Sequence, residues 1–150
     1  NEIWDETKNQ PIVDSNYELR LLDEAKKNKL NENIKKRDER LNAGIIYKNI
    51  IFDSDTDQKV NLLAMSSFMD DNDTIIWLGK ENDPLNCTKE DLLNIGNIIA
   101  QLTSAIWGND GLNQYYINTI NDCETIEEVN NIIIDYDNIS NPLLILNNND

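Results

Sequence analysis

Apolar residues recur at helical spacing in several parts of the chain, most clearly in residues 88–107. Five of them follow steps of three and four positions: Leu92, Ile95, Ile99, Leu102 and Ile106. This repeat is typical of one buried helix face. Thr88 precedes the repeat with Asp91 three positions later, which is the pattern of an N-terminal capping pair. We therefore expect a central helix here that begins after Thr88.

A second helix is predicted directly after Asp55, which suits the N-cap position because Gln58 follows three residues later. One apolar stripe at helical spacing marks this helix: Val60, Leu63, Ala64, Ser67 and Phe68. Such a stripe is typical of a surface helix that packs one face on a core.

Residues 17–43 form the longest helical pattern, but their apolar positions are sparse. Ser15 and Glu18 form a predicted capping box before it, and Gly44 suits the position after its end. We single out four apolar residues of this helix as candidate oligomerisation or partner contacts: Leu22, Leu30, Ile34 and Leu41. The spacing of the last three, with Arg37 between, fits a short coiled-coil seam with one polar layer. The alternative is a helix with one face on its own domain.

Short β-strands are predicted between these helices. Residues 45–52 are β-branched and aromatic with Lys48-Asn49 as a possible turn, so they form two very short strands or one bulged strand. Residues 74–78 read as another strand, and residues 80–87 are expected to form a loop that contains Asp83-Pro84. The first 16 residues are expected to be an extended arm, since Pro11 disfavours helix before it.

The last third carries two shorter helical segments. Residues 108–111 break the pattern with two glycines, a helix is expected over residues 112–121, and Thr125 with Glu128 forms a predicted capping box before a short helix. The sum is an α+β fold: a small, mostly helical domain with two or three short β-strands, preceded by a long N-terminal helix. We divide the chain into an arm (1–16), the long helix (17–43), the α+β domain (44–137) and a C-terminal tail (138–150).

Charge and composition narrow the function. The 150 residues carry a net charge of −15 and contain no histidine, which excludes His-based acid–base catalysis, His-activated nucleophiles and His-ligated metals. Residues 1–50 hold ten basic and ten acidic residues, whereas residues 51–150 hold 18 acidic and three basic ones. Such a surface repels phosphates and anionic lipids, so we expect neither nucleic-acid binding nor membrane insertion. The simplest interpretation of the acidic side chains is a solvated face.

Few residues suggest metal binding or catalysis. Asp53, Asp55 and Asp57 resemble the start of a calcium loop, but Gln58 stands where the glycine is needed and Ala64 where the bidentate glutamate is needed. A turn with an N-cap is the main interpretation, and weak calcium binding stays open. Without histidine partners, Cys87 and Cys123 are expected to be buried or inert thiols. Trp77 and Trp107 lie on patterned elements and are expected to be core residues. We expect no enzymatic activity and no cofactor.

A series of short motifs from residue 36 to residue 135 resembles a domain of unknown function found in bacteriophage tail-fibre and baseplate-associated proteins. The matching motifs are Arg37-Asp-Glu-Arg-Leu-Asn-Ala-Gly44, Ile51-Phe-Asp-Ser-Asp55, Gln58 with Asn61-Leu62, Ile76-Trp77, Thr88 to Gly96, and Ile120 with Thr125-Ile-Glu-Glu-Val129. Their order and spacing are more specific than any single motif. The chain departs from the family at residues 108–111, where family members have one unbroken helix.

The resemblance implies a non-enzymatic structural or attachment component of a bacteriophage tail, baseplate or tail fibre, or of a phage-tail-like bacteriocin. It implies other tail or baseplate proteins as partners and a place in the virion tail after synthesis in the cytoplasm of the host bacterium. We also expect a homo-oligomer formed through residues 17–43, a trimer being one possible state. Two alternatives stay open: a tail-fibre assembly chaperone absent from the mature particle, and an acidic decoy that binds a basic host protein.

Overall fold

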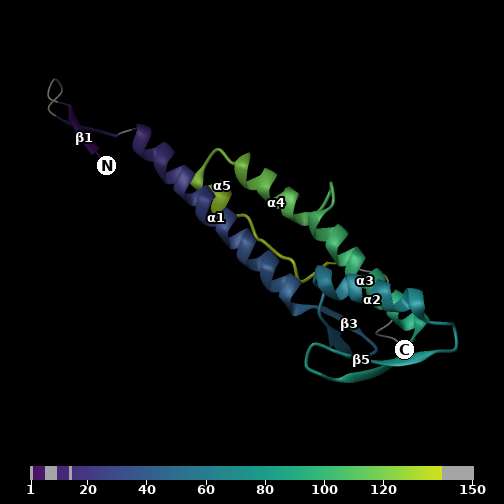
Figure 1. The fold of residues 1–150 in the computed structure, drawn as a ribbon. Helices are drawn as coiled ribbons and strands as arrows, with labels where there is room; N and C mark the ends of the chain where they lie inside the picture. Colours follow the sequence, from purple (N-terminus) through teal and green to yellow (C-terminus); the bar gives the residue numbers. More distant parts are fainter. Residues whose placement is uncertain (1, 6–9, 14, 140–150) are drawn as a thin grey trace.

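A computed structural model shows a molecule built along one long helix, α1 (Ser15–Ala43) (Figure 1). The structure describes residues 2–5, 10–13 and 15–139, with side chains from residue 16 onward. The long helix is confirmed, and Gly44 follows its end at a φ of 78°. Only glycine adopts this left-handed conformation at no steric cost, so Gly44 is well suited to end the helix. The helix already includes Ser15, the predicted N-cap, whose side chain lies outside the described residues.

The α+β class is confirmed, but the described residues contain six strands rather than two or three. They form three separate two-stranded antiparallel sheets. The strands are β1 (Glu2–Asp5), β2 (Gln10–Val13), β3 (Ile45–Tyr47), β4 (Ile50–Phe52), β5 (Thr74–Leu78) and β6 (Pro84–Thr88). The predicted extended arm is thus a β1–β2 hairpin, which lies beyond the N-terminal end of α1 (Figure 1).

The β3–β4 hairpin has the predicted turn at Lys48-Asn49. Both turn residues have positive φ, 48° and 64°, as a type I′ hairpin turn requires. Tyr47 pairs with Ile50 next to the turn, and Ile45 pairs with Phe52 at the open end. The alternation places Ile45, Tyr47 and Phe52 in the core, so this short hairpin packs against one side of that core.

The predicted loop over residues 80–87 is wrong, because half of it forms strand β6. Pro84 pairs with Leu78 and Thr88 with Thr74. Proline cannot donate a ladder hydrogen bond, but it is tolerated as the first residue of a strand. Leu85 and Cys87 then point to the core while Asn86 is exposed, which is the alternation of a strand. Asp83-Pro84 favours a loop in the sequence, and this short alternation does not outweigh it.

Helix α3 (Lys89–Trp107) is the centre of the core. All five residues of its predicted stripe are buried, and the capping box of Thr88 and Asp91 is present. Helix α2 (Thr56–Phe68) packs on α3 and has Asp55 as its N-cap, as predicted. However, α2 buries Leu62 and Ser66, and its predicted apolar stripe lies on the exposed side.

Two short helices and an extended segment complete the fold beside α1 (Figure 1). The break at residues 108–111 and helix α4 (Leu112–Asn121) are confirmed. Thr125 caps α5 (Ile126–Asn130) by accepting from the backbone N–H of Glu128, but the Glu128 carboxylate accepts from Glu124 rather than from Thr125. The chain then returns along α1, and Ile139 packs against the core cluster. The predicted tail lies outside the described residues beyond this point.

No helix among residues 15–139 is both long enough and apolar enough to span a membrane.

Candidate functional site

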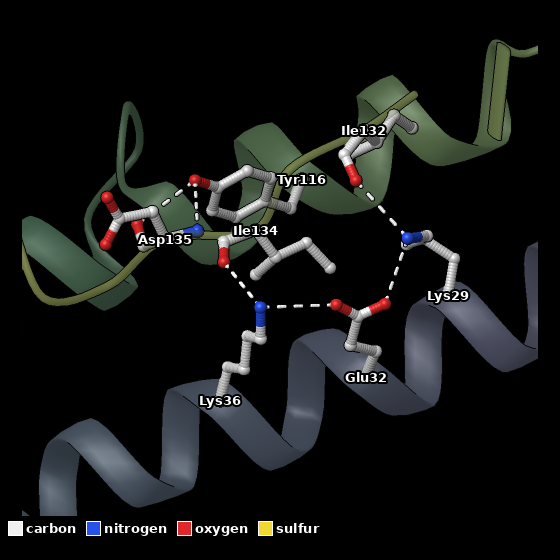
Figure 2. Close-up of polar contacts among 7 residues, drawn as sticks. All are labelled: Lys29, Glu32, Lys36, Tyr116, Ile132, Ile134 and Asp135. Atoms are coloured by element: carbon white, nitrogen blue, oxygen red, sulfur yellow. Dashed lines mark hydrogen bonds and ion pairs between the residues drawn. The ribbon is translucent and has the colours of Figure 1, made fainter. Parts of the chain in front are cut away.

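The polar side of α1 holds the extended segment that follows α5, residues 131–137. Lys29 Nζ donates to the carbonyl of Ile132 at 3.2 Å, and Lys36 Nζ donates to the carbonyl of Ile134 at 3.0 Å (Figure 2). Glu32 lies between the two lysines at 2.9 and 3.3 Å, and the hydrogen bond from Lys29 is the main cause of its lowered pKa. Lys29 and Lys36 therefore bind the chain's own backbone.

Aromatic and amide side chains extend this contact further along α1. Buried Asn33 accepts from the hydroxyl of Tyr136 at 2.6 Å, and burial raises the pKa of that hydroxyl to about 12. The Tyr116 hydroxyl accepts from the backbone N–H of Asp135 at 2.9 Å (Figure 2). Arg37 lies 4.6 Å from the centroid of the Trp107 ring. Trp107 is 49% exposed, so the prediction that it is a core residue is wrong.

The buried carboxylate of Asp91 is the centre of the densest cluster of titratable groups. It accepts from the Tyr47 hydroxyl at 2.6 Å, from Lys48 at 2.9 Å and from the backbone N–H of Thr88 at 2.9 Å. Burial alone raises the pKa of Asp91, but these three donors outweigh it and lower the pKa to about 2. The cluster joins the β3–β4 turn to the N-terminus of α3.

This cluster does not have the properties of a nucleophilic site. Burial, followed by the charge of Asp91, raises the pKa of the Cys87 thiol to about 11, so the thiol stays protonated near neutral pH. Burial and the hydrogen bond to Asp91 raise the pKa of Tyr47 to about 12. Cys123 is also buried, as predicted for both cysteines. The polar groups of this cluster bind one another, which is the arrangement of a structural network.

The acidic residues of the calcium hypothesis lie around the start of α2. Asp55 accepts from the backbone N–H of Gln58 at 2.7 Å, which is the predicted N-cap contact. Within residues 16–139, no three acidic or thiol side chains come close enough together to hold a metal ion. The contact with Gln58 confirms the turn-plus-N-cap interpretation of Asp55. Weak calcium binding stays the untested alternative.

The four candidate oligomerisation residues of α1 lie in different environments. Leu30 and Leu41 pack against the chain's own core, while Ile34 is 45% exposed. Leu22 lines a groove of about 660 Å³ between α1 and α5, together with Leu19 and Ile126. Two of the four candidates thus pack inside this molecule, and the other two, Leu22 and Ile34, lie at its surface.

The exposed side of α2 is the strongest candidate for a functional surface. We call it the α2 face and define it by five residues: Val60, Leu63, Ala64, Met65 and Phe68. Phe68 is 86% exposed, Val60 55% and Leu63 46%. Beside Phe68 lies a hollow of about 340 Å³, which Ala64, Met65 and Trp77 line. Trp77 is partly buried at the edge of the core, so it belongs both to the core and to this surface.

Carboxylates lie at both ends of the α2 face. Asp55 and Asp57 are exposed at the start of the helix, and the exposed acids Asp70, Asp71 and Asp73 follow its end. Lys59 is the only basic residue in this stretch from 53 to 73. The sequence reveals this apolar stripe through its helical spacing, but spacing shows which residues share a face and not what covers that face.

Comparison of the chain with protein-family models, curated proteins and solved structures gives no match.

Proposed function

We propose that the protein is a non-enzymatic structural or attachment component of a bacteriophage tail, baseplate or tail fibre, or of a phage-tail-like bacteriocin. Its partners are other tail or baseplate proteins, and its place is the virion tail. The setting comes from the resemblance of residues 36–135 to the tail-associated family. The means of attachment is the α2 face, and the exposure of Phe68 is the observation that carries this assignment.

Water contact with the α2 face is unfavourable, which is the physical reason to expect a partner. A large aromatic side chain buries about 150–250 Å² when it is covered, and buried apolar area stabilises a complex by about 25 cal/mol per Å². Phe68 is 86% exposed and has apolar neighbours on the same helix face. Exposed aromatic anchors beside a hollow are typical of binding hot spots.

The test asks whether the chain is part of the mature particle. Particles purified from an induced or infected host, and the lysate from which they came, are analysed by mass spectrometry. We expect the chain in both fractions at a fixed ratio to the other tail proteins. Presence in the lysate with absence from the particles would contradict the structural assignment, and it is the result expected of an assembly chaperone.

A variant pair connects this test to the α2 face. Phe68→Asp places a charge on the proposed contact, whereas Tyr115→Asp places one on the exposed surface of α4, where Tyr115 is 59% exposed. We expect particles from a strain with Phe68→Asp to contain at least about tenfold less of the chain, since a buried unpaired carboxylate costs more than 1.4 kcal/mol. Equal loss from both variants would contradict a role of the α2 face.

A further inference from the structure

We infer that the α2 face binds an amphipathic helix of a partner protein whose apolar stripe is flanked by lysine or arginine residues. The inference rests on the proposed function, because it names the chemistry of the partner at that same face. It uses three observations: the exposed apolar stripe on α2, the hollow beside Phe68, and the carboxylates at both ends of the helix.

The shape of the surface favours a helical partner. The α2 face follows one side of a helix of 13 residues, or about 20 Å at 1.5 Å per residue. Its small residue, Ala64, lies between the larger side chains of Val60 and Phe68, four positions away on either side. A helix that packs along such a row places its own side chains between these ridges. The hollow lined by Met65 and Trp77 gives one partner side chain a pocket.

The charges around the face select a basic partner. Asp57 at one end and Asp70 and Asp71 at the other are exposed, and none has an ion pair within residues 16–139. The C-terminal end of α2 also carries the negative end of the helix dipole. Lysine or arginine residues that flank an apolar stripe would meet these carboxylates, whereas an acidic partner would be repelled.

The groove between α1 and α5 offers a comparison within the same molecule. It is also apolar, with Leu19 exposed at 59%, and Glu18 and Glu124 line it. However, α1 carries the basic residues Arg20 and Lys26 close in sequence to the groove residues Leu19 and Leu22, and Lys26 donates to the carbonyl of Asn121 at 2.8 Å. We therefore use Leu19 as the position of a matched control rather than as a second site.

The experiment measures binding of a synthetic probe to the full chain. The probe is a fluorescein-labelled helical peptide of about five turns with leucines on one face, lysines at both ends and uncharged glutamine elsewhere. A second peptide has the same composition in scrambled order, so that its charge is equal and its stripe is lost. Fluorescence anisotropy at physiological salt gives both affinities, and we expect the patterned peptide to bind at least about tenfold more tightly.

Two variants locate the site on the molecule. We expect Phe68→Asp to weaken binding of the patterned peptide at least about tenfold, and Leu19→Asp to change it less than about twofold. Both side chains are exposed, so the two proteins are expected to unfold at nearly the same temperature. Replacing Asp70 and Asp71 by asparagine is expected to weaken binding and to reduce its salt dependence.

Three outcomes would overturn the inference. They are equal binding of the patterned and scrambled peptides, equal effects of the Phe68 and Leu19 substitutions, and tighter binding of a matched peptide with glutamate ends. Failure of the proposed function can be distinguished from failure of this inference. Absence of the chain from particles, together with site-specific peptide binding, would remove the virion assignment and leave the basic helical partner in place.

Discussion

Asp91 joins three parts of the molecule through one carboxylate. It completes the cap of α3, accepts from Tyr47 on β3, and pairs with Lys48 in the β3–β4 turn. A buried carboxylate in apolar surroundings normally has a raised pKa. Here the donors reverse that effect and hold the pKa near 2. Because the ordinary value is 3.8, the ionised group stabilises the folded state.

The sign of this shift predicts how stability depends on pH. The contribution of Asp91 is fully present above its unfolded pKa of 3.8 and is lost as the pH falls toward 2. Asp91→Asn is therefore expected to lower the free energy of unfolding by roughly 2 kcal/mol at neutral pH, and by less near pH 2. Urea unfolding of both proteins at the two pH values measures the difference. A difference that stays constant or grows on acidification contradicts the assigned role.

The contacts of α1 show how a polar helix face can serve as an internal surface. Lys29, Lys36 and Asn33 have long or amide side chains, and they reach backbone and hydroxyl groups of the segment after α5. That segment, residues 131–137, has no strand partner for its carbonyls among the described residues. The lysines therefore supply donors that a neighbouring strand would otherwise supply.

We predict that these lysines protect the C-terminal segment from local opening. A Lys29→Met, Lys36→Met double variant loses two partly exposed contacts, each worth about 1 kcal/mol. Hydrogen exchange at the backbone N–H of Asp135, which donates to Tyr116, is expected to speed up at least about fivefold. Amides in the middle of α3 are expected to keep their rates. Lys27→Met, on the exposed side of α1, is the matched control, and an equal effect from it would contradict the prediction.

The elements that sequence predicted well are those with local signals. Thr88, Asp55 and Gly44 mark their helix ends because capping depends on residues within one turn. The position of a helix face is not a local property. The spacing of the α2 stripe therefore does not reveal that Leu62 and Ser66 are the buried residues of this helix. In the same way, nothing in the spacing of Lys29 and Lys36 shows that backbone carbonyls lie opposite them.

The distribution of charge over the whole molecule follows from these contacts. The neutral first 50 residues include the cations of α1, and several of these bind carbonyls of the acidic second part of the chain. Residues 51–150 supply the whole net charge of −15. A large net negative charge also allows the chain to expose an apolar face without aggregating. Repulsion between like-charged copies opposes non-specific aggregation, while a basic partner is attracted.

The oligomeric state is a property of the whole molecule, and it can be measured directly. Of the candidate contacts on α1, Ile34 is the one that is both exposed and clear of the chain's own core. We expect sedimentation equilibrium at micromolar concentration to give a mass above that of the monomer, and Ile34→Glu to reduce it. Phe68→Glu is the matched control, because it places the same charge on the α2 face. A monomeric mass for the unchanged chain would contradict the oligomer. If only Phe68→Glu reduces the mass, the contact between copies lies on α2 rather than on α1.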